Sequence, residues 1–237
     1  MAVLIVQTGT TIPEIRERRG DFDDWIIDGM NLALSDVHVF EAYQGLEAPR
    51  ATDYEGIVIT GSSAMVSEQA AWSERTARWL DKAVSADVPI LGICYGHQLL
   101  AHALGGTVGK NPNGREIGTV EVILAADAKT DELFCAFDTT LTVHATHRES
   151  VVKLPSEATL LASSQADAHH AFVIGKRAWG IQFHPEFDAD IMRGYLMARR
   201  ETLVQEALDP DKLMANVSDR TDGRTVLQRF SAIIQNN

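Results

Sequence analysis

The 237-residue chain has 45% hydrophobic and 23% charged residues, a balance typical of an ordinary globular protein. This composition excludes a disordered, collagen-like or membrane-spanning chain, and the length allows one large domain or one domain with an appendage. The 33 acidic residues outnumber the 21 basic ones, which gives a formal net charge of −12. Because this charge repels phosphate backbones and anionic lipids, we expect neither nucleic acid nor a membrane as a partner.

Cysteine usage and the first residues of the chain suggest a cellular compartment. Cys94 and Cys135 form neither a Cys-x-x-Cys pair nor a disulfide framework, which favours a reducing environment. The chain starts without a basic region, and its only early apolar run, Val3 to Val6, is too short for the apolar region of a signal peptide. We therefore interpret this run as the first buried strand of a cytoplasmic protein.

Short apolar runs alternate with helical patterns in the first half of the chain, as in βα units around a parallel sheet. The expected strands are Val3 to Val6, Val37 to Phe40, Gly56 to Thr60 and Pro89 to Ile93. Apolar residues between the last two recur at helical spacing and predict an amphipathic crossover helix: Trp72, Trp79, Leu80, Ala83 and Val84. A second helix, Tyr95 to Leu104, follows Ile93 almost without a linker and ends at Gly105 and Gly106.

Beyond Gly106 the pattern changes to short strands without long helices, which predicts antiparallel ribbons added to a parallel core. These strands are 118–124, 140–145, 150–154, 159–163, 171–174 and 179–183. Residues 188–237 are predicted to be helical, with interruptions at 209–210 and 219–223. We find no repeat or linker, so we expect an α/β domain over 1–187 with a helical C-terminal extension, 188–237, packed on the same domain. Trp72, Trp79 and Trp179 are interpreted as core aromatics, and Trp25 as helix packing.

Cys94 stands where an apolar strand runs directly into a helix. The sequence 92–96, Gly-Ile-Cys-Tyr-Gly, has the spacing of a G-x-S-x-G nucleophile elbow with sulfur in place of the hydroxyl. The flanking glycines permit a sharp turn, and the N-terminus of the following helix favours a thiolate. A lone cysteine is usually a small buried apolar residue, and Cys135 keeps that interpretation, but the strand, turn and helix around Cys94 predict a nucleophile.

A thiol nucleophile needs a base, and His184 is the best placed of the eight histidines. It ends the strand pattern 179–183 and precedes Glu186 by two residues, so both side chains point to the same side of an extended chain. Glu186 can then accept one imidazole N–H and leave the other nitrogen for sulfur. From spacing alone, a surface loop whose His and Glu meet only water is equally possible. No set of residues has convincing zinc-ligand spacing, and we expect no metal.

Two ordered motifs carry a resemblance to a known family. The sequence 92–98, Gly-Ile-Cys-Tyr-Gly-His-Gln, followed by His-Pro-Glu at 184–186, resembles the class I glutamine amidotransferases with a Cys-His-Glu triad. The resemblance covers roughly residues 50 to 187, and the sequences 115–118 and 147–151 are most similar to the GMP-synthetase-like branch. It implies a stand-alone amidotransferase domain with a flavodoxin-like αβα sandwich and a mostly parallel central sheet, which releases ammonia from the side chain of glutamine.

The resemblance also assigns roles to single residues. Cys94 would be the nucleophile, His184 the base and then the acid, and Glu186 the orienting carboxylate. Residues 60–63, just after a strand, fall where the family has its oxyanion loop, which implies that the N–H groups of Gly61 and Tyr95 hold the oxyanion; without the resemblance they are only a turn. The positions implied to contact or frame the substrate are Ser63, Gln98, Thr146, Arg148 and Glu149. The mechanism needs no cofactor.

Two departures from the family pattern bear on the substrate. Residues 60–62 are Thr-Gly-Ser in place of the usual Gly-Gly-Pro, and Arg148 stands where many relatives have glycine. A bulky cation there would either close the pocket to glutamine or recruit a carboxylate from a longer γ-glutamyl substrate. The sequence contains no P-loop motif for ATP, so an ammonia acceptor would have to be activated by a separate synthetase subunit.

Three functions therefore compete on the sequence alone. The first is a glutamine amidotransferase that hydrolyses glutamine to glutamate and ammonia through a γ-glutamyl thioester on Cys94. The second is a γ-glutamyl peptide or amide hydrolase with the same triad, which Arg148 and the missing synthetase motif favour. The third, a catalytically silent binding module, is disfavoured because such a descendant has no chemical reason to keep Cys94, His184 and Glu186.

Overall fold

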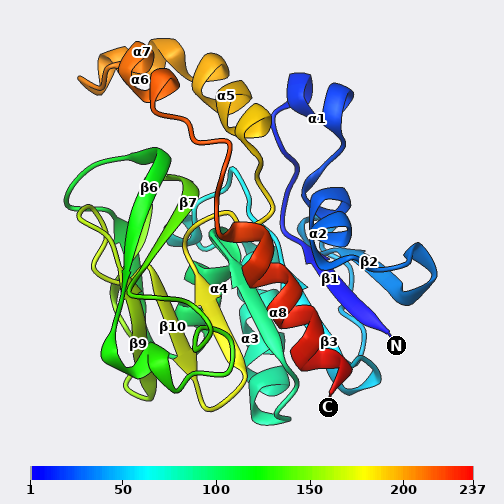
Figure 1. Cartoon of the computed structure of the whole chain (residues 1–237). Coiled ribbons are helices and arrows are strands. Elements are labelled where there is room, and N and C mark those ends of the chain that lie inside the picture. The colour runs from blue at the N-terminus through cyan, green and yellow to red at the C-terminus, as the bar shows by residue number, and fades with distance from the viewer. Residues whose placement is uncertain (1, 237) are drawn as a thin grey trace.

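The computed structural model of the chain describes residues 2–236, which form an α/β fold around a nine-stranded sheet (Figure 1). The strand order is β2-β1-β3-β4-β11-β10-β9-β6-β7. The strands of this sheet are β1 (Val3–Gln7), β2 (Val37–Glu41), β3 (Gly56–Ile59), β4 (Ile90–Ile93), β6 (Glu116–Leu124), β7 (Thr140–His147), β9 (Ala158–Ser163), β10 (Ala171–Ile174) and β11 (Ala178–Ile181). A separate antiparallel pair joins β5 (Thr107–Lys110) and β8 (Glu149–Lys153).

The sheet has a parallel half and an antiparallel half, as the sequence predicts. Strands β2, β1, β3, β4 and β11 run parallel to their neighbours, and β10, β9, β6 and β7 follow in antiparallel pairs. β1, β3, β4 and β11 are buried along their whole length, which explains why their sequences are almost entirely apolar. One prediction needs correcting: β11 is not only part of an antiparallel ribbon, since it also pairs in parallel with β4. The carboxyl ends of β4 and β11 therefore lie side by side.

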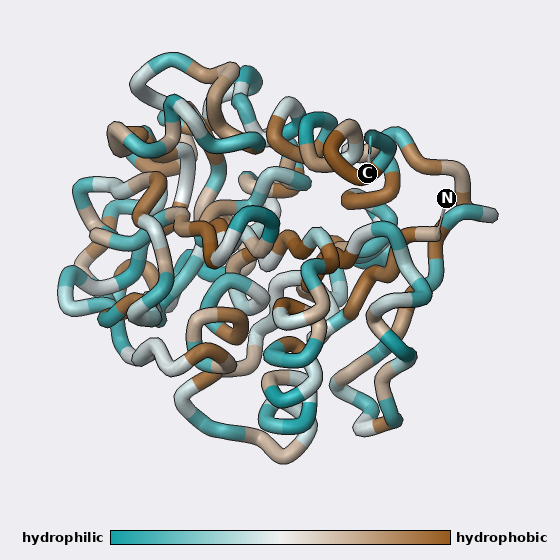
Figure 2. Tube along the Cα trace, turned by 90° about the horizontal axis from the view of Figure 1, so that it is seen from below, coloured by the Kyte–Doolittle hydropathy of each residue, from teal (hydrophilic) through white to brown (hydrophobic). Residues whose placement is uncertain are grey.

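Helices cover both faces of the sheet and make an αβα sandwich. α3 (Ala71–Ser85) and α4 (Tyr95–Ala103) pack on one face, and α2 (Phe22–Met30) and α8 (Gly223–Gln235) on the other. In Figure 2 the hydrophobic stretches gather along the central strands, and the hydrophilic ones lie mainly on the outer turns. No helix within residues 2–236 is both long and apolar enough to cross a membrane.

The remaining helices gather at one end of the molecule, at the top of Figure 1. They are α1 (Pro13–Arg19), α5 (Ala189–Ala198), α6 (Arg200–Gln205) and α7 (Pro210–Ala215). They share a third apolar cluster with Phe22 and Phe187. α7 begins at Pro210 with Asp209 as its N-cap, and α8 begins at Gly223, so the predicted interruptions are helix starts.

Two predictions about buried residues are wrong. Cys135 is exposed, because residues 131–135 form a helical turn in which the neighbouring Leu133 and Phe134 occupy the buried side.

Trp72 and Trp79 are only partly buried against the core, because they stand at the margin of the apolar stripe of α3. Trp179 is fully buried, as predicted, and Trp25 packs from α2.

Candidate active site

Cys94 lies in a strained turn between β4 and α4. Its backbone has φ 50° and ψ −98°, a conformation that a residue with a side chain rarely adopts. The turn is tight because a Cβ at Gly96 would lie 2.5 Å from the carbonyl oxygen of Ile59. The Cys94 N–H donates to the Ile181 carbonyl oxygen at 2.8 Å, which ties the turn to the end of β11. The backbone makes the sharp strand-to-helix turn that the motif predicts.

His184 and Glu186 meet beside this turn. His184 Nδ1 donates to Glu186 Oε1 at 2.7 Å, and the Cys94 side chain lies near enough to influence the charge of His184. The imidazole stacks on Phe187 with ring centroids 4.1 Å apart, so Phe187 shields one face of the imidazole from water. Burial alone would lower the pKa of His184, but Glu186 and Cys94 outweigh it and raise that pKa to about 10. This raised pKa favours the imidazolium form of His184 beside Glu186.

The two residues predicted to form the oxyanion hole, Gly61 and Tyr95, come from different elements near the triad. Gly61 follows β3 and abuts the His184 ring, since a Cβ there would lie 2.9 Å from His184 Cε1. The hydroxyl of Thr8 donates to the Thr60 carbonyl oxygen at 2.9 Å. Because the C=O and N–H of a trans peptide point in opposite directions, the N–H of Gly61 points away from Thr8. Tyr95 is the first residue of α4, where a backbone N–H has no intrahelical acceptor.

The residues predicted to contact the substrate converge on one small pocket of about 80 Å³. It is lined by Cys94 and Tyr95 together with the predicted Ser63, Gln98, Thr146, Arg148 and Glu149. A wider cavity of about 630 Å³ adjoins it and shares Arg115, Arg148 and Glu149 with it. The site thus has a narrow inner part at the sulfur and a roomier outer part.

Two of these residues are held by the protein itself. Gln98 Nε2 donates to the Glu149 carbonyl oxygen at 2.8 Å and to Gln182 Oε1 at 3.0 Å. The Glu149 carboxylate accepts hydrogen bonds from the N–H and the hydroxyl of Ser67. Both side chains therefore shape the pocket wall, and the Gln98 amide nitrogen already has its acceptors.

Sequence reasoning missed two arginines on the pocket wall, Arg115 as a lining residue and Arg199 altogether. Arg115 precedes β6 and pairs with Glu206, and Arg199 lies between α5 and α6. Nothing in the local sequence marks Arg199, because it reaches the pocket only through the packing of the C-terminal helices.

A buried polar cluster supports the pocket from behind. Glu116 Oε2 accepts hydrogen bonds from His147 Nε2 and His170 Nε2, each at 2.8 Å, and His147 Nδ1 donates to the Glu149 carbonyl oxygen at 2.9 Å. One ligand atom from each of these three side chains lies within 4.8 Å of the others, so the cluster has the donor types of a metal site. Both imidazoles already donate to the Glu116 carboxylate, and Ser164 donates to its other oxygen, so we interpret the cluster as a structural network that fixes the turn before β8.

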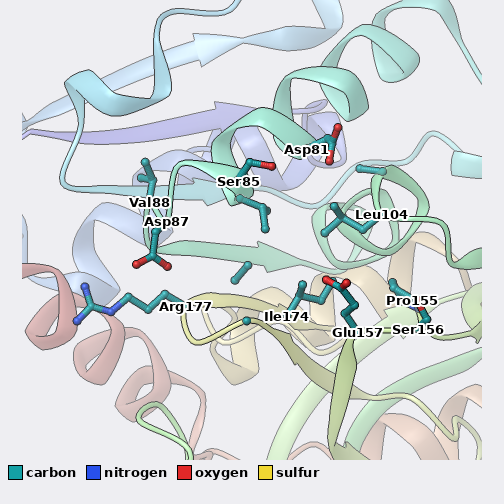
Figure 3. Close-up of a pocket in the computed structure, with 14 residues that line it drawn as sticks. Asp81, Ser85, Asp87, Val88, Leu104, Pro155, Ser156, Glu157, Ile174 and Arg177 are labelled. Atoms are coloured by element: carbon teal, nitrogen blue, oxygen red, sulfur yellow. The ribbon is translucent and has the colours of Figure 1, made fainter.

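A second large cavity, of about 550 Å³, lies far from the triad (Figure 3). Asp81, Ser85, Asp87, Glu157 and Arg177 line it, where α3 ends and β4 and β11 begin. It is therefore at the opposite end of the strands from Cys94. None of the predicted site residues borders it, and it is not part of the candidate active site.

The chain is similar to several known proteins. A family model described as glutamine amidotransferase class-I matches residues 20–200. The chain is 32% identical to gamma-glutamyl peptidase 3 of Arabidopsis thaliana over 142 residues, which are 59% of this chain and 57% of that protein. It is 35% identical to a GMP synthase [glutamine-hydrolyzing] of Wolinella succinogenes over 147 residues, which are 61% of this chain and 27% of that protein.

The fold has relatives among solved structures as well. A glutamine amidotransferase from Thermotoga maritima superposes with a TM-score of 0.75 at 24% identity, covering 99% of this chain and 97% of that one. The likeness thus extends over the whole fold, including the C-terminal helices. By contrast, the matches to the two curated relatives span little more than half of one and about a quarter of the other.

Proposed function

Because the chain belongs to the class-I glutamine amidotransferase family, we propose that it hydrolyses γ-glutamyl amide bonds through a thioester on Cys94, with glutamine as the first candidate substrate. One observation carries the proposal: the strained turn brings Cys94 next to a His184 that Glu186 holds at 2.7 Å. The three residues supply a nucleophile, a base beside it and a carboxylate that orients the base, which is the set that acyl transfer to sulfur requires.

The first half of the reaction forms the thioester. The Cys94 sulfur adds to the amide carbon of the substrate, and the carbonyl oxygen gains negative charge as the carbon becomes tetrahedral. The N–H groups of Gly61 and Tyr95 are assigned to that oxygen, and each such donor is commonly worth about 3 kcal/mol in the transition state. The His184 imidazolium gives its Nε2 proton to the leaving nitrogen, the carbon–nitrogen bond breaks, and ammonia departs from glutamine.

The second half returns the enzyme to its starting state. Neutral His184 takes a proton from a water molecule, whose oxygen attacks the thioester carbon. The carbon–sulfur bond breaks, glutamate leaves, and Cys94 and His184 are again the sulfur anion and the imidazolium. Glu186 keeps Nδ1 protonated throughout, so Nε2 is always the nitrogen that exchanges the proton.

A second substrate class, γ-glutamyl peptides, is favoured by one observation. Arg148 is exposed, lines both the inner pocket and the wider cavity, and has no ion-pair partner within residues 2–236. Glutamine offers no carboxylate beyond its scissile bond, whereas a γ-glutamyl dipeptide does. One relative is named a peptidase and another a GMP synthase, so either leaving group has a precedent in the family.

A direct assay tests the proposal. We would measure ammonia release from glutamine and amine release from γ-glutamyl dipeptides, with Cys94→Ala as the inactive control and Cys135→Ser as the matched cysteine control. Release that depends on Cys94 and survives Cys135→Ser is expected. If the wild-type protein released nothing from either substrate class, the silent binding module would replace this proposal. Where ammonia is passed on to an acceptor, we propose a separate synthetase subunit as the partner.

A further inference from the structure

Three arginines from three separate segments line the pocket that contains Cys94. Arg115 comes from the residue before β6, Arg148 from the turn between β7 and β8, and Arg199 from the junction of α5 and α6. The chain as a whole carries a net charge of −12. Glu149 is the one carboxylate residue among those that line this pocket, so the local charge is positive and opposite in sign to that of the whole molecule.

The three cations differ in how they are paired. Arg115 donates from Nε and Nη2 to the two carboxylate oxygens of Glu206, at 2.6 and 2.9 Å. Arg148 has no carboxylate partner in the described chain. Arg199 has a buried Nε without a hydrogen-bond partner, and its guanidinium lies 5.6 Å from the centre of the Tyr195 ring. Two of the three guanidinium groups thus retain donors for an anion.

The surroundings of Arg199 disfavour its positive charge unless an anion lies nearby. Burial, together with the positive charges of Arg115 and Arg148, lowers the pKa of Arg199. Because Arg199 is partly buried and forms no ion pair in the described chain, it carries a desolvation penalty that an anion bound on its pocket side would relieve. Arginine is also the side chain best suited to a carboxylate, since its planar fork matches both oxygens.

We propose that Arg148 and Arg199 together form an anion subsite for the carboxylate of the leaving group in a γ-glutamyl substrate. The inference rests on the proposed function and deepens it: the C-terminal helices supply a specificity residue, Arg199, that the catalytic motifs do not contain. The wider cavity of about 630 Å³ begins at Arg148, so a leaving group larger than ammonia has room beyond the subsite.

The first test does not require turnover. In a Cys135→Ser background, Cys94 is alkylated with iodoacetate, which is anionic, and with iodoacetamide, which is neutral. Replacing Arg199 or Arg148 by glutamine is expected to lower the iodoacetate-to-iodoacetamide rate ratio by roughly ten- to a hundredfold, the value of a lost hydrogen bond to a charged group. Arg199→Lys should retain most of the ratio because it keeps the charge.

Arg200→Gln is the matched control for this test. Arg200 follows Arg199 directly, but it is exposed and already pairs with Asp211 at 2.8 Å, so its replacement should leave the ratio unchanged. An unchanged ratio in Arg199→Gln, or an equal change in Arg200→Gln, would overturn the subsite. Because alkylation needs only the Cys94 sulfur, this result stands even if the protein hydrolyses none of the substrates tested.

The second test identifies which carboxylate binds. Wild type and Arg199→Gln are compared on glutamine, γ-glutamyl methylamide and γ-glutamylglycine, of which only the last has a carboxylate on the leaving side. We expect kcat/KM to fall roughly ten- to a hundredfold on γ-glutamylglycine and to change little on the other two. Equal losses on all three would place the α-carboxylate of the glutamyl group at Arg199 and contradict the leaving-side assignment.

Discussion

At the scale of single residues, the proposed reaction depends on side chains whose hydrogen bonds leave only one atom available for it. His184 has one nitrogen bound to Glu186, so only its Nε2 is available to Cys94. These residues could be predicted because each motif carries its reason in the sequence: glycines around a cysteine, and a histidine two residues before a glutamate. Arg199 and the exposure of Cys135 could not, because side-chain direction in a helical turn or junction depends on tertiary packing.

The roles within the triad predict unequal effects of substitution. Cys94→Ala and His184→Ala should each reduce kcat/KM by about 10⁶-fold, because nucleophile and base act as one unit. Glu186→Gln should cost about 10⁴-fold, since it mainly sets the tautomer and orientation of the imidazole. Steady-state kinetics on the better substrate would measure all three. A folded Glu186→Gln protein less active than Cys94→Ala would show that the roles are misassigned.

Gly61 is predicted to be irreplaceable even by alanine. The added Cβ would lie 2.9 Å from His184 Cε1, so the imidazole has to move away from its position beside Cys94. A displacement of about 1 Å is enough to cost on the order of a hundredfold in kcat. Gly109→Ala is the control, because a Cβ there meets nothing within 4 Å and Gly109 lies in β5. Equal kcat in Gly61→Ala and wild type would show that the contact between Gly61 and the His184 ring does not fix the position of the imidazole.

At the scale of elements, the buried strands were predictable from the sequence, and the pairing between strands was not. β1, β3 and β4 are almost entirely apolar. The sequence predicts an interruption at Asp209 and Pro210, and in the structure these residues begin α7. β5 has no such run, since its residues are exposed or half-buried, and the sequence does not predict it. β11 was found, but its local sequence is the same whether its neighbour runs parallel or antiparallel, so its parallel register with β4 required the structure.

Helix α6 is expected to control how many cations face the pocket. Glu206, which follows α6, neutralises Arg115 through two hydrogen bonds, so Glu206→Gln should release Arg115 as a third free cation. For a partly exposed charge worth about 0.4 to 1 kcal/mol, the iodoacetate-to-iodoacetamide ratio at Cys94 should rise about two- to fivefold. The increase should shrink at 1 M salt, where screening is strong.

Glu201→Gln is the matched control for this helix. Glu201 is exposed on α6 and forms no ion pair in the described chain, so its removal changes the net charge by the same amount at a different place. A similar increase in both variants would mean that only the overall charge matters. The local effect expected of Glu206 would then be contradicted.

At the scale of the whole molecule, the site is held by contacts between segments far apart in the chain. Glu116 is 31 residues from His147 and 54 from His170, yet both imidazoles donate to the same carboxylate oxygen. No spacing rule finds such a cluster, which is why metal-ligand patterns in the sequence did not reveal it. Its function follows from its position: His147 joins Glu116 to the carbonyl of Glu149, next to Arg148 on the pocket wall.

This cluster predicts a pH-dependent contribution to the stability of the fold. Burial alone would raise the pKa of Glu116, but the hydrogen bonds from His147 and His170 outweigh it and hold that pKa well below its usual range. A carboxyl whose folded pKa is lowered stabilises the fold above its unfolded pKa of about 4.3, and this contribution is lost as the pH falls toward the folded value. Glu116→Gln should therefore lower the free energy of unfolding at pH 7 by about 3 to 5 kcal/mol, the cost of breaking a buried charged pair. The difference from wild type should narrow below pH 4. Urea unfolding between pH 3 and 7 would measure it, with the exposed Glu121→Gln on the same strand as the control; a Glu116→Gln protein as stable as that control at pH 7 would show that the cluster does not hold the fold.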